Sequence, residues 1–268
     1  MTCKDPVILV SNDDGVGSIG LHRLAEALKG VGDVYVVAPD RERNAASHAL
    51  TLHKPLRAEE IRHGVFSLNG TPTDCVNFGV LFLLKGRRPD LIVSGINKGG
   101  NLGDDVTYSG TVSAAMEGTL LGIPSIAFSQ LDPGEGTGAQ GKYHFETAAR
   151  FAVGLTRLVL EKGLANGTFL NVNVPNRPPA DIKGVRVTSL GKRVFNEGAI
   201  VENTDPRGRK YYWIGLNGMT WEKEPKNADH KAIEEGAISV TPLHLDLTDY
   251  EAVERLSPWN GWLSEWIG

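Results

Sequence analysis

Cysteine is scarce in this sequence. The 268 residues include two cysteines, Cys3 and Cys75, which lie far apart and lack the spacing of a metal site. A disulfide framework is therefore not expected. Instead, we expect reduced thiols in a cytoplasmic protein. An H-x-x-x-H pair, a C-x-x-C pair, a G-x-S-x-G elbow and a G-x-x-x-x-G-K-[ST] loop are also missing. These absences exclude the commonest zinc, esterase and P-loop sites.

The sequence also lacks an excess of positive charge and long apolar runs. Its formal net charge is -4, and no cluster of Lys or Arg dominates any segment. A nucleic-acid polymer is therefore not an expected partner. No uninterrupted apolar span reaches membrane length, and residues 1–10 hold one short apolar run without a cleavage-site pattern. We expect a cytoplasmic protein that is neither secreted nor membrane-embedded.

Strand-like and helix-like segments alternate along the first two thirds of the chain. Strands are predicted at residues 7–10, 34–38, 89–94, 124–128 and 169–175, and helices at 21–28, 112–121 and 145–162. This alternation predicts an α/β fold with a doubly wound, mostly parallel sheet. We expect residues 1–180 to form this core.

The pattern changes beyond Pro179. Segments 197–203 and 209–216 flank a turn at 205–208 and predict a β-hairpin that is too apolar to stand alone. Residues 238–242 predict a last strand, which we expect to return to the core. The C-terminal segment carries Trp259, Trp262 and Trp266, an aromatic stripe expected to pack against the body or another subunit. We therefore treat residues 181–268 as a hairpin and oligomerisation region.

The first predicted strand is followed directly by Asn12-Asp13-Asp14-Gly15. The carboxyl end of a central strand is where open α/β sheets bind ligands. Neighbouring carboxylates raise each other's pKa unless a cation neutralises them, which favours a bound metal ion. A simple turn or a helix cap is the alternative interpretation, because Asn, Asp and Gly are common in both.

Three glycines after the first strand suggest a different function. Gly15, Gly17 and Gly20 match G-x-G-x-x-G between a strand and a helix, and Asp40 follows the second strand where a ribose-binding acid would stand. However, Asp13 and Asp14 would face the pyrophosphate of a dinucleotide. Unit charges a few Å apart repel by roughly 4 kcal/mol at an effective dielectric of about 20. The sequence therefore favours a metal over a dinucleotide.

Further polar residues follow the other predicted strands. The loop 38–48 can bring Asn44 toward a metal and an anionic ligand, and Asn97 offers a neutral oxygen to a hard cation. Ser109 and Thr111 open a helix, whose N-terminal N–H groups can bind phosphate; simple capping is the alternative interpretation, and the two roles are compatible. Oxygen ligands of this kind suit Mg²⁺ or Mn²⁺, and metal-assisted hydrolysis of a phosphate ester is the chemistry they favour.

Seven motifs, in order along nearly the whole chain, resemble the SurE family of survival-protein nucleotidases. They are Ser11-Asn12-Asp13-Asp14-Gly15, Ala38-Pro39-Asp40-Arg41, Gly70-Thr71-Pro72-Thr73-Asp74-Cys75-Val76, Val93-Ser94-Gly95-Ile96-Asn97, Asn101-Leu102-Gly103-Asp104-Asp105, Tyr108-Ser109-Gly110-Thr111-Val112 with Ala114-Ala115-Met116-Glu117-Gly118, and Ser239-Val240-Thr241-Pro242-Leu243. The resemblance implies a Rossmann-like core with a projecting hairpin and a C-terminal segment exchanged between subunits of a homodimer or homotetramer.

The resemblance also implies site residues. The metal ligands fall on Asp13, Asp14 and Asn97, and the fourth falls on Asn44, where the family usually has serine. Asp13 and Asp14 are also the implied catalytic residues. Substrate phosphate is expected to contact Asn44, Asn101, Ser109, Gly110 and Thr111. A second departure from the family pattern is Ala228, which stands before Asp229 where threonine is usual.

The implied activity is metal-dependent hydrolysis of nucleoside 5′- and 3′-monophosphates, and of short polyphosphate in some members. Two alternatives stay open at this point. One is a dinucleotide-dependent oxidoreductase that uses Gly15, Gly17 and Gly20. The other is a nucleotide-binding sensor that has lost catalysis.

Overall fold

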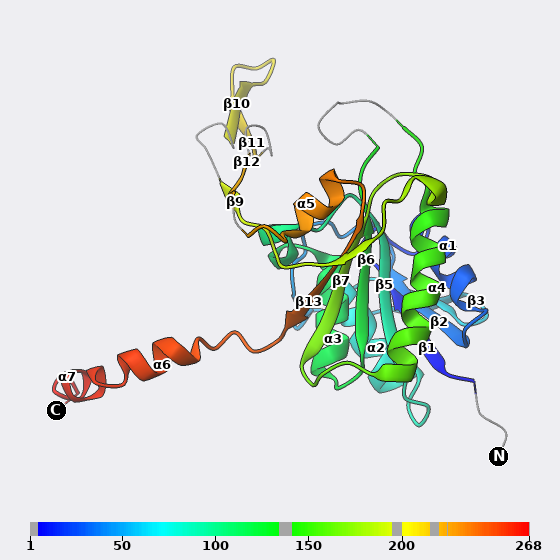
Figure 1. Ribbon diagram of the computed structural model, residues 1–268. Coiled ribbons are helices and arrows are strands. Elements are labelled where there is room, and N and C mark those ends of the chain that lie inside the picture. The colour runs from blue at the N-terminus through cyan, green and yellow to red at the C-terminus, as the bar shows by residue number, and fades with distance from the viewer. Residues whose placement is uncertain (1–4, 134–140, 195–199, 215–219, 224, 268) are drawn as a thin grey trace.

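A nine-stranded sheet forms the centre of the computed structural model, which describes residues 5–133, 141–194, 200–214, 220–223 and 225–267 (Figure 1). In sheet order the strands are β3 (Ala58–Arg62), β4 (Val65–Leu68), β2 (Asp33–Pro39), β1 (Val7–Ser11), β5 (Leu91–Lys98), β6 (Ser125–Gln130), β7 (Thr168–Val174), β13 (Ile238–His244) and β8 (Val185–Val187).

The six strands from β4 to β7 are parallel to one another. Antiparallel pairing occurs outside this block, where β3 pairs with β4 and β13 pairs with β7, and β8 then lies parallel to β13. The chain runs from β1 outward to β2 and β4, then crosses to β5 and continues to β6 and β7. The strand order therefore reverses between β1 and β5, and such a switch point is where ligands bind. The predicted α/β, mostly parallel architecture is confirmed.

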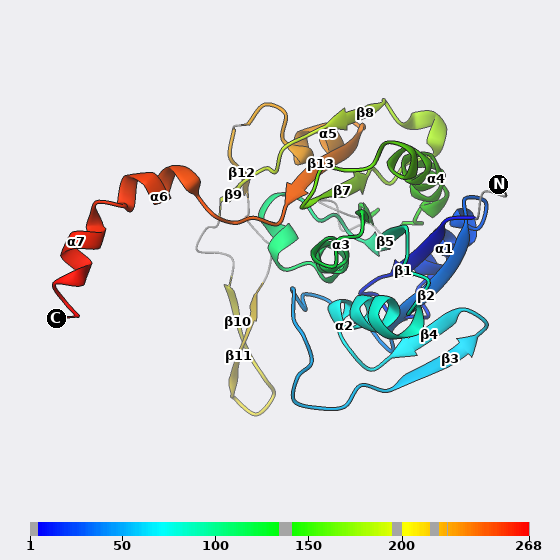
Figure 2. The ribbon, with the colours of Figure 1, turned by 90° about the horizontal axis from the view of Figure 1, so that it is seen from below.

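Helices cover both faces of the sheet (Figure 2). On one face lie α1 (Ile19–Leu28) and α4 (Phe145–Lys162), and on the other lie α2 (Pro72–Phe78), its one-turn π continuation η1 (Gly79–Leu83), and α3 (Gly110–Leu120). Helix α2 begins with a capping box, in which Thr71 accepts the N–H of Asp74 while the Asp74 carboxylate accepts the N–H of Thr71. Pro72 follows at the first helical position, as a helix start of this type favours.

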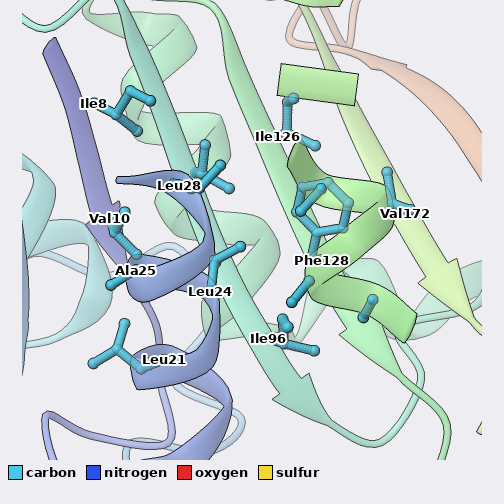
Figure 3. Close-up of a cluster of buried hydrophobic side chains, with 14 of the residues drawn as sticks. Ile8, Val10, Leu21, Leu24, Ala25, Leu28, Ile96, Ile126, Phe128 and Val172 are labelled. Atoms are coloured by element: carbon cyan, nitrogen blue, oxygen red, sulfur yellow. The ribbon is translucent and has the colours of Figure 1, made fainter. Parts of the chain in front are cut away.

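Strand β1 is buried on both faces. Ile8 and Val10 lie in the same cluster as Leu24 of α1 (Figure 3). Leu9 belongs to the cluster on the opposite face, together with Val76 of α2. Because successive side chains of a strand point to opposite faces, each apolar residue of β1 lies in one of the two cores. The rigid end of β1 therefore fixes the position of the residues that follow it.

Short elements connect the sheet to the peripheral parts of the molecule. They are η2 (Gly103–Thr107), η3 (Pro179–Asp181), α5 (Asp229–Glu234), and a ribbon made of β9 (Arg193–Val194) paired with β12 (Thr220–Trp221). Beyond this ribbon the hairpin of β10 (Ile200–Thr204) and β11 (Lys210–Ile214) projects from the body (Figure 1). The first residues of the predicted hairpin, 197–199, and its last residues, 215–216, lie outside the described residues.

The C-terminal arm, residues 247–267, extends away from the body and contains α6 (Tyr250–Leu256) and α7 (Trp259–Ser264) (Figure 1). All of its residues except the half-buried Ala252 are exposed. Within the described ranges, no helix is both long enough and apolar enough to cross a membrane.

Candidate active site

Asp13 lies just beyond β1 and is nearly buried, at 4% exposure. The Thr111 hydroxyl donates a hydrogen bond to its carboxylate, and its backbone carbonyl accepts the N–H of Arg43 at 2.7 Å. Burial raises the pKa of Asp13, while hydrogen bonds from Thr111 and from the backbone at Gly110 and Thr111 oppose that rise. The direct contact between Asp13 and Thr111, which are 98 residues apart, could not be predicted from local sequence pattern.

Asp14 is half-buried beside Asp13. Its carboxylate accepts the backbone N–H of Lys98 at 3.3 Å and the Ser18 hydroxyl at 3.5 Å. Burial raises the pKa of Asp14 to about 6, and the negative charge of Asp13 adds to the effect. The positive charge of Lys98 opposes this rise, and a divalent cation between the two carboxylates would favour their ionised forms further.

Asn97 lies at the carboxyl end of β5, directly across the switch point from Asp13 and Asp14. Its amide nitrogen donates to the Gly99 carbonyl at 2.9 Å, which leaves the amide oxygen as the group that can coordinate a cation. Across the described residues, no three His, Cys, Asp or Glu side chains gather into a metal site. The donor set is thus two carboxylates and an amide oxygen, which fits a hard divalent cation.

The loop after β2 carries Asn44 past the same place. Arg43 is anchored to the Asp13 carbonyl, and the Ser47 hydroxyl donates to the Thr107 carbonyl at 2.8 Å. A Cβ on Gly15, whose φ is +92°, would come within 2.9 Å of the Arg41 backbone, so glycine permits this close approach. Asn44 is exposed and lies next in sequence to the Arg43 anchor.

The N-terminus of α3 forms the other side of the site. Ser109 caps this helix by accepting the N–H of Val112 at 3.1 Å, so the expected capping role is found. A Cβ on Gly110 would lie 2.7 Å from Cβ and 2.9 Å from Oδ2 of Asp13. Glycine is therefore required sterically where the helix end meets the carboxylate. The structure brings Ser109, Gly110 and Thr111 together with Asp13.

Asn101 is buried in a network of amides. Its side-chain nitrogen donates to the Ser129 hydroxyl at 2.6 Å, and its backbone N–H donates to Oδ1 of Asn173 at 2.8 Å. Its carbonyl accepts the side-chain amides of both Asn171 and Asn173, at 2.8 and 2.9 Å. These partners were not predicted from the sequence, although alternating asparagines in a buried strand place two amides on one face.

Two glycines of the pattern, Gly15 and Gly20, permit close packing of the backbone. A Cβ on Gly20 would lie 2.0 Å from the Ile96 carbonyl oxygen, so this glycine lets α1 approach β5. Asp40, the candidate ribose-binding acid, pairs with Arg43 at 3.4 Å and with Arg41 at 3.3 Å. Both observations agree with the preference for a metal over a dinucleotide.

Comparison with known proteins adds independent support. The model of the family described as "Survival protein SurE" matches residues 8–197. A protein named "5'-nucleotidase SurE" from Geobacter metallireducens is 56% identical over 253 residues, which covers 94% of this chain and 97% of that protein. Its namesake from Geotalea daltonii is 55% identical, with 94% of this chain and 98% of that protein covered. The crystal structure of the SurE protein from Aquifex aeolicus superposes with a TM-score of 0.82 at 42% identity, covering 95% of this chain and 100% of that one.

Proposed function

This chain belongs to the SurE family, and from that membership we propose that it is a metal-dependent 5′-nucleotidase, which hydrolyses nucleoside monophosphates to nucleoside and phosphate. The observation that carries the proposal is the contact of Asp13 with Gly110 and Thr111. It places a carboxylate pair and the N-terminus of a helix side by side at the switch point of the sheet. A cation on the first and a phosphate on the second would then be neighbours.

Asp13, Asp14, Asn97 and Asn44 are the residues that would hold Mg²⁺ or Mn²⁺. When bound, such an ion makes a water molecule more acidic and offsets negative charge on the phosphoryl oxygens. The positive dipole end of α3 would favour the phosphate anion beside Asp13, and the Ser109 cap keeps that helix end in place. Asp13 or Asp14 orients the attacking water or accepts its proton, which requires the carboxylate to be ionised.

The proposal extends to finer points of substrate and assembly. Nucleoside 3′-monophosphates and short polyphosphate are further candidate substrates. We assign the protein to the cytoplasm on the basis of its cysteine usage. Residues 1–180 are proposed as the catalytic core, and residues 181–268 as the region that forms a homodimer or homotetramer. The exposed aromatic side chains of the hairpin and of the C-terminal arm support that assembly.

A phosphatase assay on a panel of nucleotides tests the activity. We expect phosphate release that stops with EDTA and returns with Mg²⁺ or Mn²⁺. Asp13→Asn should lower kcat by roughly a thousandfold or more, because the cation loses a charged ligand. The circular dichroism spectrum should not change. Asp33→Asn is the matched control, since Asp33 lies at the opposite end of the sheet and pairs with Arg87.

The same assay separates the alternatives. Turnover by Asp13→Asn at the parent rate would contradict the proposal. Binding of a nicotinamide cofactor that is unaffected by chelation would favour an oxidoreductase. Tight binding of nucleotide without turnover would favour a sensor.

A further inference from the structure

One segment, residues 101–105, joins the two halves of the proposed site. It follows β5 and Asn97 on the metal side, and it leads through η2 to Ser109 on the phosphate side. We call these five residues the connector. Because η2 begins at Gly103 and the Tyr108 N–H donates to the Asp105 carbonyl at 3.0 Å, the placement of the connector sets where α3 begins.

The carboxylate of Asp229 is buried against the connector, with no exposed surface. Its Oδ2 accepts the N–H of Gly103 at 2.8 Å. Its Oδ1 accepts the N–H of Gly191 at 2.9 Å and that of His230 at 2.8 Å. Backbone donors from two distant segments, together with the N–H of the next residue, thus converge on one side chain, which lies at the start of α5.

The surroundings leave the connector little freedom at this point. Gly103 has a φ of +53°, and a Cβ there would lie 2.6 Å from the Gly191 carbonyl oxygen and 2.6 Å from the Trp221 ring. The N–H of Gly103 therefore points at Asp229 from a tightly packed backbone. An alternative acceptor could enter only if the loops moved apart.

The ribbon of β9 and β12, from which the hairpin projects, is fixed to the same connector. Arg193 of β9 donates its Nε to the Asp105 carboxylate at 3.0 Å and its backbone N–H to Oδ2 of Asp104 at 2.8 Å. The Arg193 guanidinium lies 4.2 Å from the centroid of the Trp221 ring, and that ring stacks on His230 at 4.3 Å. The stack ends beside Asp229, so the ribbon and the carboxylate act on one segment.

We propose that Asp229 is a positioning residue, whose carboxylate holds the connector and thereby the phosphate-binding end of α3. The same carboxylate joins the connector to the ribbon of β9 and β12. The inference rests on the proposed nucleotidase function. Asp229 does not touch the proposed metal ligands and takes no part in the bond-breaking step. Its effect is on how well the phosphate is held.

Asp229→Asn tests this role with an isosteric side chain. One of the two carboxylate oxygens becomes an NH₂ group. The asparagine keeps the most hydrogen bonds when this NH₂ group faces Gly103, because the remaining oxygen then still accepts the N–H groups of Gly191 and His230. The Gly103 N–H loses its acceptor and faces another donor. We expect KM for nucleoside monophosphate and the inhibition constant of inorganic phosphate to rise by about tenfold, while kcat and Mn²⁺ affinity change by less than about twofold.

Amide hydrogen exchange provides a readout that does not depend on activity. We expect faster exchange across residues 101–110 in Asp229→Asn, and no change there in the matched control Asp249→Asn. Asp249 caps α6 by accepting the Ala252 N–H at 2.9 Å, so the control makes the same chemical change in the C-terminal arm. Arg193→Gln weakens a second contact with the connector, through Asp105, and it should show the same pattern with a smaller rise in KM.

The possible results separate clearly. A fall in melting temperature with unchanged KM, phosphate inhibition and exchange would reduce Asp229 to a structural role and overturn the inference. If Asp229→Asn does not fold, Arg193→Gln decides by the same measurements. If the parent protein releases no phosphate, the proposed function fails, and exchange at the connector together with phosphate binding still decides the positioning role.

Discussion

The sheet and the two projecting segments use the same kinds of side chain in opposite ways. In the sheet, Phe128 and Ile8 have no exposed surface. In the hairpin, Trp213 is 65% exposed, and in the C-terminal arm Trp266 is 88% exposed. Apolar surface of this size seldom faces water without a function. The contrast indicates that the core obtains its stability within one chain, and we place the proposed assembly on the segments that project from it.

The largest difference between the two regions should be in stability. Phe128→Ala leaves a cavity between β6 and the helices, and we expect it to lower the free energy of unfolding by about 4 kcal/mol. Trp213→Ala removes a larger side chain from the hairpin, yet it should change that free energy by less than about 0.5 kcal/mol. Urea denaturation at a concentration where the protein sediments as a monomer measures both. Equal effects would show that the hairpin packs on its own core.

The second prediction concerns the point where the rigid core meets the proposed phosphate site. Gly110→Ala places a methyl group 2.7 Å from Cβ of Asp13, so either the carboxylate or the start of α3 must move. Displacement of this kind should lower kcat/KM by about a hundredfold, or about 2.7 kcal/mol. Gly17→Ala is the control, because a Cβ there meets no described atom within 4 Å. Similar kinetics for the two variants would contradict the proposed role of the helix end.

The third prediction tests the arm as an assembly surface. Trp262, exposed on α7, is a candidate anchor residue, and Trp262→Ser should weaken self-association by about thirtyfold, or about 2 kcal/mol. Sedimentation over a range of protein concentrations measures the change. Leu120→Ser serves as the control, since it removes an exposed apolar side chain at the end of α3. Association that is equally weakened by both variants, or by neither, would remove the arm from the proposed interface.

The sequence predicted the parts of the site that depend on local pattern. The apolar run before Asn12 indicates a central strand, and a central strand ends at the ligand-binding edge, so Asp13 and Asp14 could be placed from neighbouring residues alone. The same reasoning placed Asn97 beyond the predicted strand 89–94, where the structure has the carboxyl end of β5, and placed Ser109 at a helix start. These predictions needed no knowledge of which distant segments meet.

Contacts between distant polar groups could not be predicted in this way. Asn173 and Asn101 are 72 residues apart, and Asp229 and Gly103 are 126 residues apart. Hydrophobic periodicity says which face of an element is buried, but it does not say which donor meets which acceptor. A buried asparagine or aspartate signals only that some partner exists, because an unpaired polar group is costly. The supporting contacts of the site therefore came from the structure.

The smallest predicted effect on activity is at Asn44. This residue lies in an exposed loop whose backbone is bonded to the core. The N–H of Arg43 fixes this loop to Asp13, and the Ser47 contacts with the segment before α3 fix its far side, so the identity of residue 44 has little influence on its path. Asn44→Ser keeps a neutral oxygen, and kcat/KM should change by less than about threefold, or about 0.7 kcal/mol. Asn44→Ala removes that oxygen, and it should weaken Mn²⁺ binding by about tenfold. If the two variants bind Mn²⁺ equally well, residue 44 is not a ligand.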